Sequence, residues 1–210
     1  MNIGIFGGAF NPVHNGHLML IDVLSRAPMK PEYKSLDKFI IIPTANPPHR
    51  SGADFADSKH RVKMLRLALK DNEIFNPKVS YNKLEISDIE FQLEGKSYTY
   101  NTIITLKNLY PTDNFYLFMG SDQLLNFNSW YNYKKIMKMV RIVGFSRCKE
   151  DNERLKRFIE TSDVKADLVL TEPFEVSSSD IRKMINNGES VSGLIPSSVE
   201  AYIKENGLYV

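Results

Sequence analysis

Four largely apolar runs, each ending at or beside a glycine, a proline or a serine, constrain the fold of this chain more than any other feature. They lie at Asn2–Phe6, Lys38–Pro43, Asn114–Met119 and Val140–Phe145, and a shorter run covers Asp167–Leu170. Apolar runs of this length between turn residues are typical of strands buried on both faces. Segments with helical spacing lie between them. The sequence therefore predicts an α/β fold with a parallel sheet covered by helices on both faces.

Helices are predicted wherever apolar residues recur at helical spacing between these runs. The predicted helices cover Gly16–Ala27, Thr99–Leu109, Ser179–Asn187 and Ser197–Glu205. A further helix is expected to begin after Ser58, which would be its N-cap. The alternation over Lys78–Ser87 predicts one or two further strands. A chain of 210 residues can bury one sizeable core. We expect a single domain over residues 1–210, whose C-terminal helices, about 177–206, form a small helical subdomain.

Charge and composition disfavour several classes of function. The 27 basic and 25 acidic residues leave a net charge of +2, so no summed field attracts a nucleic acid or a membrane surface. No apolar stretch is long enough for a membrane span, and the first residues do not resemble a signal peptide. The single cysteine, Cys148, excludes an intrachain disulfide. We expect a cytoplasmic protein without nucleic-acid or membrane partners, and the sequence leaves open whether it is a homo-oligomer.

The loop after the first run holds the most informative residues. Gly7 and Gly8 let the backbone approach a ligand closely, since no Cβ intervenes. His14 and His17 stand at the start of a predicted helix, where free N–H groups and the helix dipole favour an anion, and Gly16 permits a bend between them. Two imidazoles that donate to phosphate oxygens are one interpretation, and a pair of surface or N-capping histidines is another. Zinc is disfavoured because no cysteine or third ligand stands at suitable spacing.

Two motifs carry a resemblance to a known superfamily. The segment GGAFNPVHNGHL, from Gly7 to Leu18, resembles the signature of the HxGH nucleotidyltransferases, and VSSSDIR, from Val176 to Arg182, is similar to their ISSTxIR motif. The resemblance implies a Rossmann-like fold of the nucleotidyltransferase type, with His14, His17 and Arg182 as catalytic residues. The residues that it assigns to ATP are Gly7, Gly8, Ala9, Phe10, Gly16, His17, Gly120, Asp122, Ser146, Arg147, Ser178, Ser179, Ile181 and Arg182.

The middle of the chain resembles the bacterial nicotinate-nucleotide adenylyltransferases of that superfamily. Three segments carry this likeness: the PPHR run Pro47–Arg50, Glu90 with the GKSYTYNT run Gly95–Thr102, and GSD at residues 120–122 followed by Trp130-Tyr131. The resemblance assigns the acceptor to His49, Thr99, Trp130 and Tyr131. It implies that the indole stacks on a pyridine ring and that the Tyr131 N–H meets a carboxylate. Asn101 and Glu94 depart from the family pattern, which has an aspartate and a basic residue there.

The implied reaction moves the adenylyl group of ATP onto nicotinic acid mononucleotide, giving nicotinic acid adenine dinucleotide and pyrophosphate in NAD biosynthesis. Mg²⁺ would arrive with ATP, so no metal-binding residue is nominated. Nicotinamide mononucleotide and phosphopantetheine are alternative acceptors, and a catalytically silent nucleotide-binding module is a rival from another class. A dinucleotide-binding oxidoreductase is disfavoured because no GxGxxG fingerprint is present.

Overall fold

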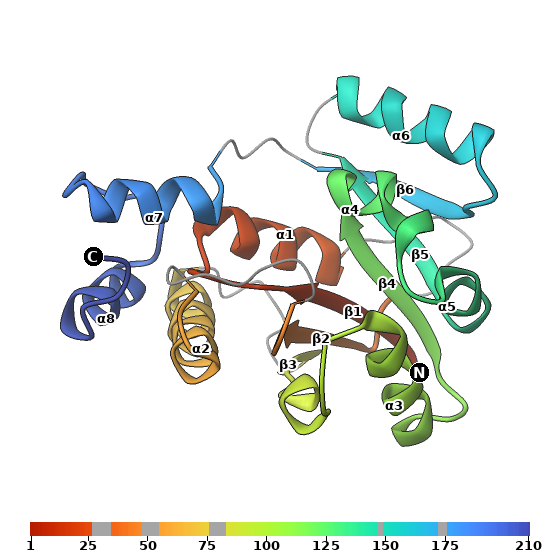
Figure 1. Cartoon of the computed structure of the whole chain (residues 1–210), viewed down its shortest axis with the longest axis horizontal. Coiled ribbons are helices and arrows are strands. Elements are labelled where there is room, and N and C mark those ends of the chain that lie inside the picture. Colours follow the sequence, from red (N-terminus) through yellow and green to blue (C-terminus); the bar gives the residue numbers. More distant parts are fainter. Residues whose placement is uncertain (27–34, 48–54, 76–82, 147–148, 172–175) are drawn as a thin grey trace.

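The computed structural model describes residues 1–26, 35–47, 55–75, 83–146, 149–171 and 176–210, and Figure 1 shows their arrangement. The strands are β1 (Asn2–Gly8), β2 (Lys38–Pro43), β3 (Leu84–Ile86), β4 (Asn114–Gly120), β5 (Arg141–Ser146) and β6 (Ala166–Leu170). The α-helices are α1 (Asn15–Arg26), α2 (Ser58–Phe75), α3 (Thr99–Leu109), α4 (Ser121–Leu125), α5 (Tyr133–Met139), α6 (Lys149–Thr161), α7 (Ser178–Asn186) and α8 (Ser197–Glu205). Short 3₁₀ turns cover Ile89–Gln92 and Phe127–Ser129.

The six strands form one parallel sheet in the order β3-β2-β1-β4-β5-β6. This confirms the predicted α/β fold. The chain builds one half of the sheet outward from β1 to β3 and then returns to place β4 on the other side of β1. The strand order therefore reverses between β1 and β4, and open sheets of this kind bind ligands beyond the carboxyl ends of the strands at that point.

The alternation of side chains along each strand divides the core into two layers. On one face, Phe6, Phe39 and Phe118 pack with the apolar residues of α1, α2, α7 and α8. On the other face, Ile5, Ile40 and the intervening strand residues pack with α3, α4, α5 and α6. The helices thus cover both faces of the sheet, as Figure 1 also shows.

Two strand glycines are needed because the layers approach closely. A Cβ on Gly4 would lie 2.6 Å from Cδ2 of Phe39 and 2.9 Å from Cδ1 of Leu36. A Cβ on Gly144 would lie 2.4 Å from Cδ2 of Leu124. Neither contact is tolerable without movement of a buried side chain, so both glycines serve packing.

The C-terminal helices pack against the rest of the chain rather than standing apart from it. In α8, Val199 and Ile203 belong to the same apolar cluster as α1 and α2. The Asp71 carboxylate in α2 accepts a hydrogen bond from the Ser198 N–H at 3.2 Å, and so caps the start of α8. His60 Nδ1 lies 2.9 Å from the Tyr202 hydroxyl. Whether these helices form a subdomain of a single domain stays a prediction.

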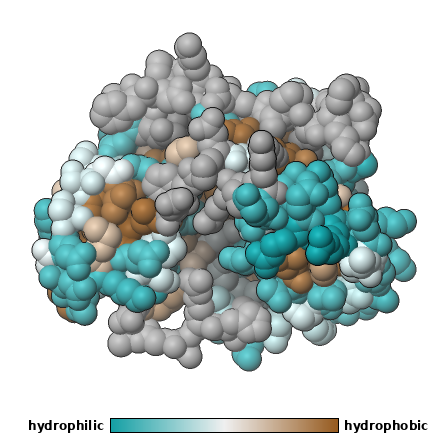
Figure 2. Space-filling model, turned by 90° about the horizontal axis from the view of Figure 1, so that it is seen from above, coloured by the Kyte–Doolittle hydropathy of each residue, from teal (hydrophilic) through white to brown (hydrophobic). Residues whose placement is uncertain are grey.

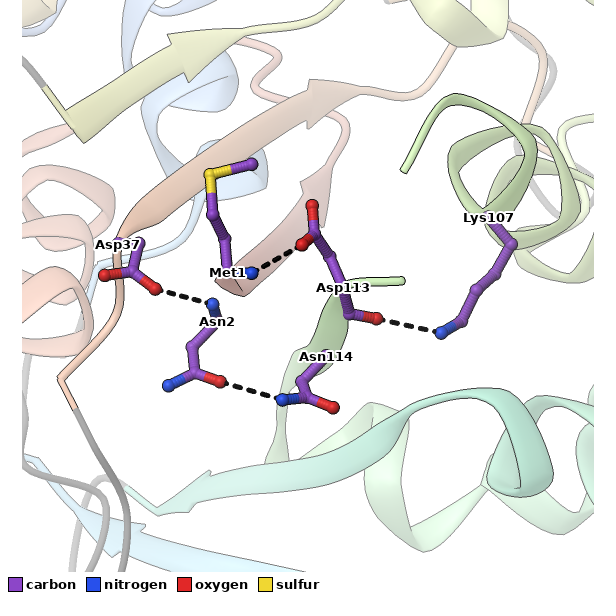
Figure 3. Close-up of polar contacts among 6 residues, drawn as sticks. All are labelled: Met1, Asn2, Asp37, Lys107, Asp113 and Asn114. Carbon is purple, nitrogen blue, oxygen red and sulfur yellow. Dashed lines mark hydrogen bonds and ion pairs between the residues drawn. The ribbon is translucent and has the colours of Figure 1, made fainter. Parts of the chain in front are cut away.

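Polar groups close the amino ends of β1 and β4, at the edge of the sheet opposite the switch point (Figure 3). The Asn114 amide donates to Asn2 Oδ1 at 3.1 Å, and the Asn2 N–H donates to the Asp37 carboxylate at 2.7 Å. The Met1 amine is paired with Asp113, whose carbonyl accepts from Lys107 at 3.0 Å. These bonds satisfy backbone and side-chain groups that the ends of parallel strands leave open.

The outer face of α6 carries charges of both signs. On the face of the molecule in Figure 2, a hydrophilic area lies over this helix. Arg154 pairs with Asp151 at 3.4 Å, and Lys156 pairs with Glu153 at 2.7 Å. Among the helices that the structure describes, none is both long and apolar enough to cross a membrane.

The predicted elements match the structure closely, with one correction. The predicted bounds of β2, α3 and α8 are those observed, and the bounds of β1, α1, β4, β5, β6 and α7 differ from the predicted ones by at most two residues. The expected N-cap at Ser58 is wrong, because the Asp57 carbonyl accepts the first helical bond, from Arg61, and Ser58 already lies inside α2. Of the segment Lys78–Ser87, predicted to form one or two strands, residues 78–82 lie outside the described part, and β3 occupies residues 84–86 of the rest.

We expect Gly4→Ala to lower the free energy of unfolding by about 1–3 kcal/mol, because the new methyl group overpacks the contact with Phe39 and Leu36. Urea unfolding followed by circular dichroism measures the change. Gly120→Ala is the matched control, since its Cβ would meet, among the residues that the structure describes, only Phe145, at an ordinary 3.5 Å. Equal losses in both variants would contradict this account of Gly4.

Candidate active site

The loops that leave β1, β2, β4 and β5 lie along one edge of the sheet. Gly8 is in register with Pro43, and Gly120 is in register with Phe145, so these strands end at nearly the same level. The Thr44 N–H donates to the Gly8 carbonyl at 2.9 Å, which continues the pairing beyond β2. The segments that follow these strands therefore lie along a common edge, at the switch point of the sheet.

The two glycines at the end of β1 differ in what surrounds them. A Cβ on Gly8 would lie 3.0 Å from the ring of Phe10, so packing requires this glycine. A Cβ on Gly7 would meet, among the described residues, only the Ile42 carbonyl oxygen, at 4.0 Å. Space therefore remains beside Gly7 for another molecule to approach the backbone.

Phe10 supports the loop from below rather than lining its surface. Its backbone has φ of 47°, in the left-handed region that non-glycine residues seldom adopt. Its side chain is 1% exposed and packs edge-on against Phe6 at 5.9 Å and against His17 at 5.1 Å. Of the residues predicted to bind ATP, Phe10 can therefore offer only its backbone, while its ring fixes the position of the His17 imidazole.

His14 and His17 form a stacked pair at the first turn of α1. His14 is the N-cap, because its carbonyl accepts from Leu18, and His17 is the third helical residue. The ring centroids lie 3.8 Å apart. The His14 N–H donates to Nδ1 of His17 at 3.3 Å, so this nitrogen carries no proton. In the neutral ring the proton is then on Nε2, which can donate to an acceptor at the helix amino terminus.

The amino end of α7 is held against the first loop. Arg182 donates to the Asn11 carbonyl at 2.9 Å, and the Ser178 hydroxyl donates to the Pro12 carbonyl at 2.9 Å. The Nε atom of Arg182 is buried and has no hydrogen-bond partner among the described residues. An unpaired buried donor is costly, and an anionic ligand would satisfy it.

The first turn of α7 offers further donors. Ser177 is the N-cap and shares a capping box with Asp180, and these bonds hold the pKa of the Asp180 carboxyl below its usual value. The N–H groups of Ser178 and Ser179 belong to the first turn, where no carbonyl of the helix reaches them. Ile181, predicted to bind ATP, has a fully buried side chain and belongs to the core.

Two of the residues predicted to bind the acceptor, Thr99 and Tyr131, belong to segments whose aromatic rings are in contact. The Tyr131 ring, 54% exposed, lies 5.0 Å from the ring of Tyr98 and 5.7 Å from the ring of Tyr100. These tyrosines flank Thr99, the first residue of α3, so Thr99 and Tyr131 belong to one cluster. Trp130 is half-buried and packs edge-on against Phe127 at 5.4 Å.

The remaining residues predicted to bind ATP or the acceptor lie at the ends of strands and helices or outside the part of the chain that the structure describes. Gly120 and Asp122 lie at the start of α4, where the Asp122 side chain is exposed. Ser146 is fully buried at the end of β5, and its carbonyl accepts two hydrogen bonds from Thr171. Gly16 lies in the first turn of α1. Arg147 and His49 lie outside the described residues.

Three residues that the sequence did not single out hold the first loop in place. Asn11 is fully buried, and its Oδ1 accepts from the Ala56 N–H at 3.0 Å and from the Tyr209 hydroxyl at 2.8 Å. Burial raises the pKa of Tyr209, against the opposing effect of Arg182 and Arg61. The Arg61 guanidinium donates to the Ala9 carbonyl at 2.9 Å. Only the asparagine lies inside a motif, so local sequence offered no signal for the other two.

No group of three His, Cys, Asp or Glu side chains is placed to hold a metal ion in the parts of the chain that the structure describes. The site instead consists of hydrogen-bond donors: two imidazoles, a guanidinium and the N–H groups at the starts of α1, α3 and α7. Donors of this kind, gathered at helix amino termini, suit anionic ligands.

Comparison with known proteins places the chain in a family. The family model described as cytidylyltransferase-like matches residues 5–184. A nicotinate-nucleotide adenylyltransferase of Bacillus subtilis (strain 168) is 36% identical over 208 residues, which cover 99% of this chain and 97% of that protein. The chain belongs to the nicotinate-nucleotide adenylyltransferase family. The resemblance inferred from the motifs is thereby confirmed, as is the prediction of a nucleotidyltransferase enzyme.

Other members and solved structures agree with this membership. A probable nicotinate-nucleotide adenylyltransferase of Fusobacterium nucleatum is 36% identical over 207 residues, covering 98% of both chains. The Plasmodium falciparum nicotinic acid mononucleotide adenylyltransferase complexed with NaAD has a TM-score of 0.76 at 24% identity, covering 99% of this chain and 97% of that chain. A putative Vibrio parahaemolyticus nicotinate-nucleotide adenylyltransferase has a TM-score of 0.67 at 22% identity, covering 99% and 94%. At these identities the two structures bear on the fold, which is of the nucleotidyltransferase type.

The hydrogen bond between His14 and His17 predicts a single tautomer. We expect the neutral His17 ring to carry its proton on Nε2, because Nδ1 accepts from the His14 N–H. Two-bond ¹H–¹⁵N correlation spectra of the histidine rings distinguish the tautomers, and His60 serves as an internal comparison remote from the loop. A proton found on Nδ1 of His17 would rule out this geometry.

Proposed function

We propose that this chain transfers the adenylyl group of ATP to nicotinic acid mononucleotide. The acceptor phosphate attacks the α-phosphorus in line, a new P–O bond forms, and the bond from the α-phosphorus to the bridging oxygen breaks. The products are nicotinic acid adenine dinucleotide and pyrophosphate, and the reaction belongs to NAD biosynthesis. In phosphoryl transfer of this kind, the protein positions the reactants and stabilises their charge, and it does not need to supply a covalent nucleophile.

The observation that carries this proposal is the donor cluster on the first loop. The stacked pair of His14 and His17 lies at the amino end of α1, and Arg182 is held against the same loop through the Asn11 carbonyl. Charge on the phosphate oxygens grows or shifts in the transition state, and preorganised donors stabilise it there. We assign the catalytic roles to these three residues.

The amino end of α7 is the proposed site for the leaving pyrophosphate. Its first-turn N–H groups at Ser178 and Ser179 point out of the helix, and the helix dipole adds to their attraction for an anion. The Ser178 hydroxyl is occupied by the Pro12 carbonyl, so its backbone N–H is the donor we propose. Mg²⁺ fits this site as an ion carried by ATP, since it keeps several waters and needs few protein ligands.

The acceptor side suits a ring that bears a carboxylate. Thr99 begins α3, so its N–H is free of helical partners and lies at the positive end of the helix dipole. The adjacent Tyr131 contributes a further backbone N–H, and Trp130 supplies an aromatic face. N–H donors would suit the negative carboxylate of nicotinate, whereas the amide of nicotinamide brings donors of its own.

The relatives support this acceptor over the alternatives. Nearly full-length relatives at about 36% identity are named nicotinate-nucleotide adenylyltransferases, whereas a phosphopantetheine enzyme would not need the Thr99 and Tyr131 cluster. Membership of this enzyme family disfavours the alternative of a silent nucleotide-binding module, and a turnover measurement tests it directly. A cytoplasmic location, the absence of nucleic-acid partners and the question of a homo-oligomer stay predictions of the sequence.

We expect His17→Ala to lower kcat by about 100-fold or more, on the scale of removing one preorganised donor. Pyrophosphate release from ATP and nicotinic acid mononucleotide measures the rate. His60→Gln is the matched control, because this histidine contacts Tyr202 between α2 and α8 and should keep the wild-type rate. Full turnover by the His17 variant would refute its role, and an inactive wild type would refute the proposed function.

The acceptor geometry predicts a preference for the acid over the amide. We expect kcat/KM to be about 10- to 100-fold higher with nicotinic acid mononucleotide than with nicotinamide mononucleotide, the range set by leaving one or two buried polar groups unpaired. Initial rates with the two acceptors, and with phosphopantetheine as a third, measure it. A preference for the amide would contradict the assignment of Thr99 and Tyr131.

A further inference from the structure

Arg61 is a charged side chain buried as deeply as the apolar core. It lies in the first turns of α2, is 1% exposed, and is the largest fully buried side chain among the described residues. No carboxylate in the described part of the chain lies within ion-pairing distance of it, and burial lowers the pKa of its guanidinium. Burying a cation in this way is costly unless hydrogen bonds compensate it.

The compensation comes from backbone carbonyls in three separate segments. Nε donates to Ala56 at 2.9 Å, one terminal nitrogen donates to Ala9 at 2.9 Å, and the other donates to Ala45 at 3.4 Å. The ring of Phe55 covers the guanidinium carbon at 4.4 Å. A planar fork of donors can reach three carbonyls in different directions, which a lysine ammonium on a single point cannot reproduce.

The segment after β2 is held from the opposite side by a carboxylate. Glu90, 8% exposed, accepts from the Ala45 N–H at 3.2 Å and from the Thr102 hydroxyl at 2.8 Å. Arg61 therefore binds the carbonyl of Ala45 while Glu90 binds its N–H. Asn46 continues the contact by donating its N–H to the Ser97 hydroxyl at 2.9 Å, two residues before Thr99.

The same side chain reaches the loop that leads to the histidines. Ala9 follows Gly8 and precedes Asn11, whose own carbonyl is held by Arg182. The two arginines thus grip the loop through its carbonyls, Arg61 on the strand side and Arg182 on the α7 side. A shift of the Ala9 backbone would displace Asn11 and Pro12, which follow it in the loop, and would therefore displace His14.

We propose that Arg61 is a positioning residue for adenylyl transfer, fixing the loop after β1 against the segment after β2 so that the donor and acceptor halves of the site keep their spacing. This inference rests on the proposed function and assigns Arg61 no contact with substrate. Reacting atoms displaced by about 1 Å can lose about 100-fold in rate, so a residue of this kind acts on kcat more than on ground-state binding.

The test compares Arg61→Lys with two matched variants on the same helix. Arg66→Gln removes an exposed arginine, and Leu65→Ala weakens the apolar core without removing a polar contact to either loop. All proteins are assayed with ATP and nicotinic acid mononucleotide at a temperature where thermal unfolding shows each to be folded. We expect Arg61→Lys to lower kcat by about 10- to 100-fold with a much smaller change in KM for ATP. Both matched variants should keep the wild-type kcat.

Two further readouts separate positioning from bulk stability. Added guanidinium, far below denaturing concentrations, should restore part of the rate to Arg61→Ala, and equal potassium chloride should not. Amide hydrogen exchange should quicken at Thr44 and Ala56 in Arg61→Lys relative to Ile41 within β2, whereas Leu65→Ala should quicken all three alike. Ala56 and Thr44 donate to Asn11 and Gly8, so their exchange reports the loop directly.

Different outcomes test the role of Arg61 and the proposed function. A wild-type kcat in Arg61→Lys, an equal loss in Leu65→Ala, or absence of guanidinium rescue would each overturn the role of Arg61. An inactive wild type would sink the proposed function instead, and the exchange experiment would then decide alone whether Arg61 holds the two segments. Local quickening at Thr44 and Ala56 supports it, and uniform exchange overturns it.

Discussion

The pairing of β1 with both β2 and β4 is the constraint on which the rest of the structure depends. Because β1 lies between the two halves of the sheet, its carboxyl end is the place where the strand order reverses. The loop that leaves β1 leads into α1 and contacts α2 and α7, which cover the same face of the sheet as α1. The chain returns to this loop with α7, after the last strand, and with Tyr209, close to its end. Donors from distant parts of the sequence meet there as a consequence.

That loop is fixed mainly by groups that recognise its backbone. Its carbonyls at Ala9, Asn11 and Pro12 accept from Arg61, Arg182 and Ser178. A loop held through its own side chains would have few groups left for a ligand. Here the backbone contacts hold the loop, and the role that we propose for the imidazoles is to donate to phosphate oxygens. Two side chains of the loop add support: Phe10 packs beneath it in the core, and Asn11 accepts from Ala56 and from Tyr209.

How far the sequence predicts this arrangement depends on how local each signal is. The bounds of β2, α3 and α8 follow from short apolar runs and turn residues, and the two motifs led to the histidines and Arg182. Arg61 escaped notice because an arginine among the polar positions of an amphipathic helix is typical of a solvated face. Its burial depends on carbonyls contributed by segments up to 52 residues away. Helix α6 was missed for the converse reason, since its charges of both signs leave only a weak apolar stripe.

The two arginines show how one residue type serves two purposes in this site. The three donor nitrogens of Arg61 all have carbonyl partners, and Phe55 covers its face, so it belongs to the framework. Arg182 uses one terminal nitrogen on Asn11 but keeps a buried Nε without a partner among the described residues. A buried donor without an acceptor lowers the stability of the ligand-free protein by about 1–3 kcal/mol. Folded chains retain such a cost where a ligand supplies the missing acceptor. The difference in hydrogen bonding between the two guanidinium groups supports the proposal that Arg61 builds the loop and that Arg182 binds the polyphosphate.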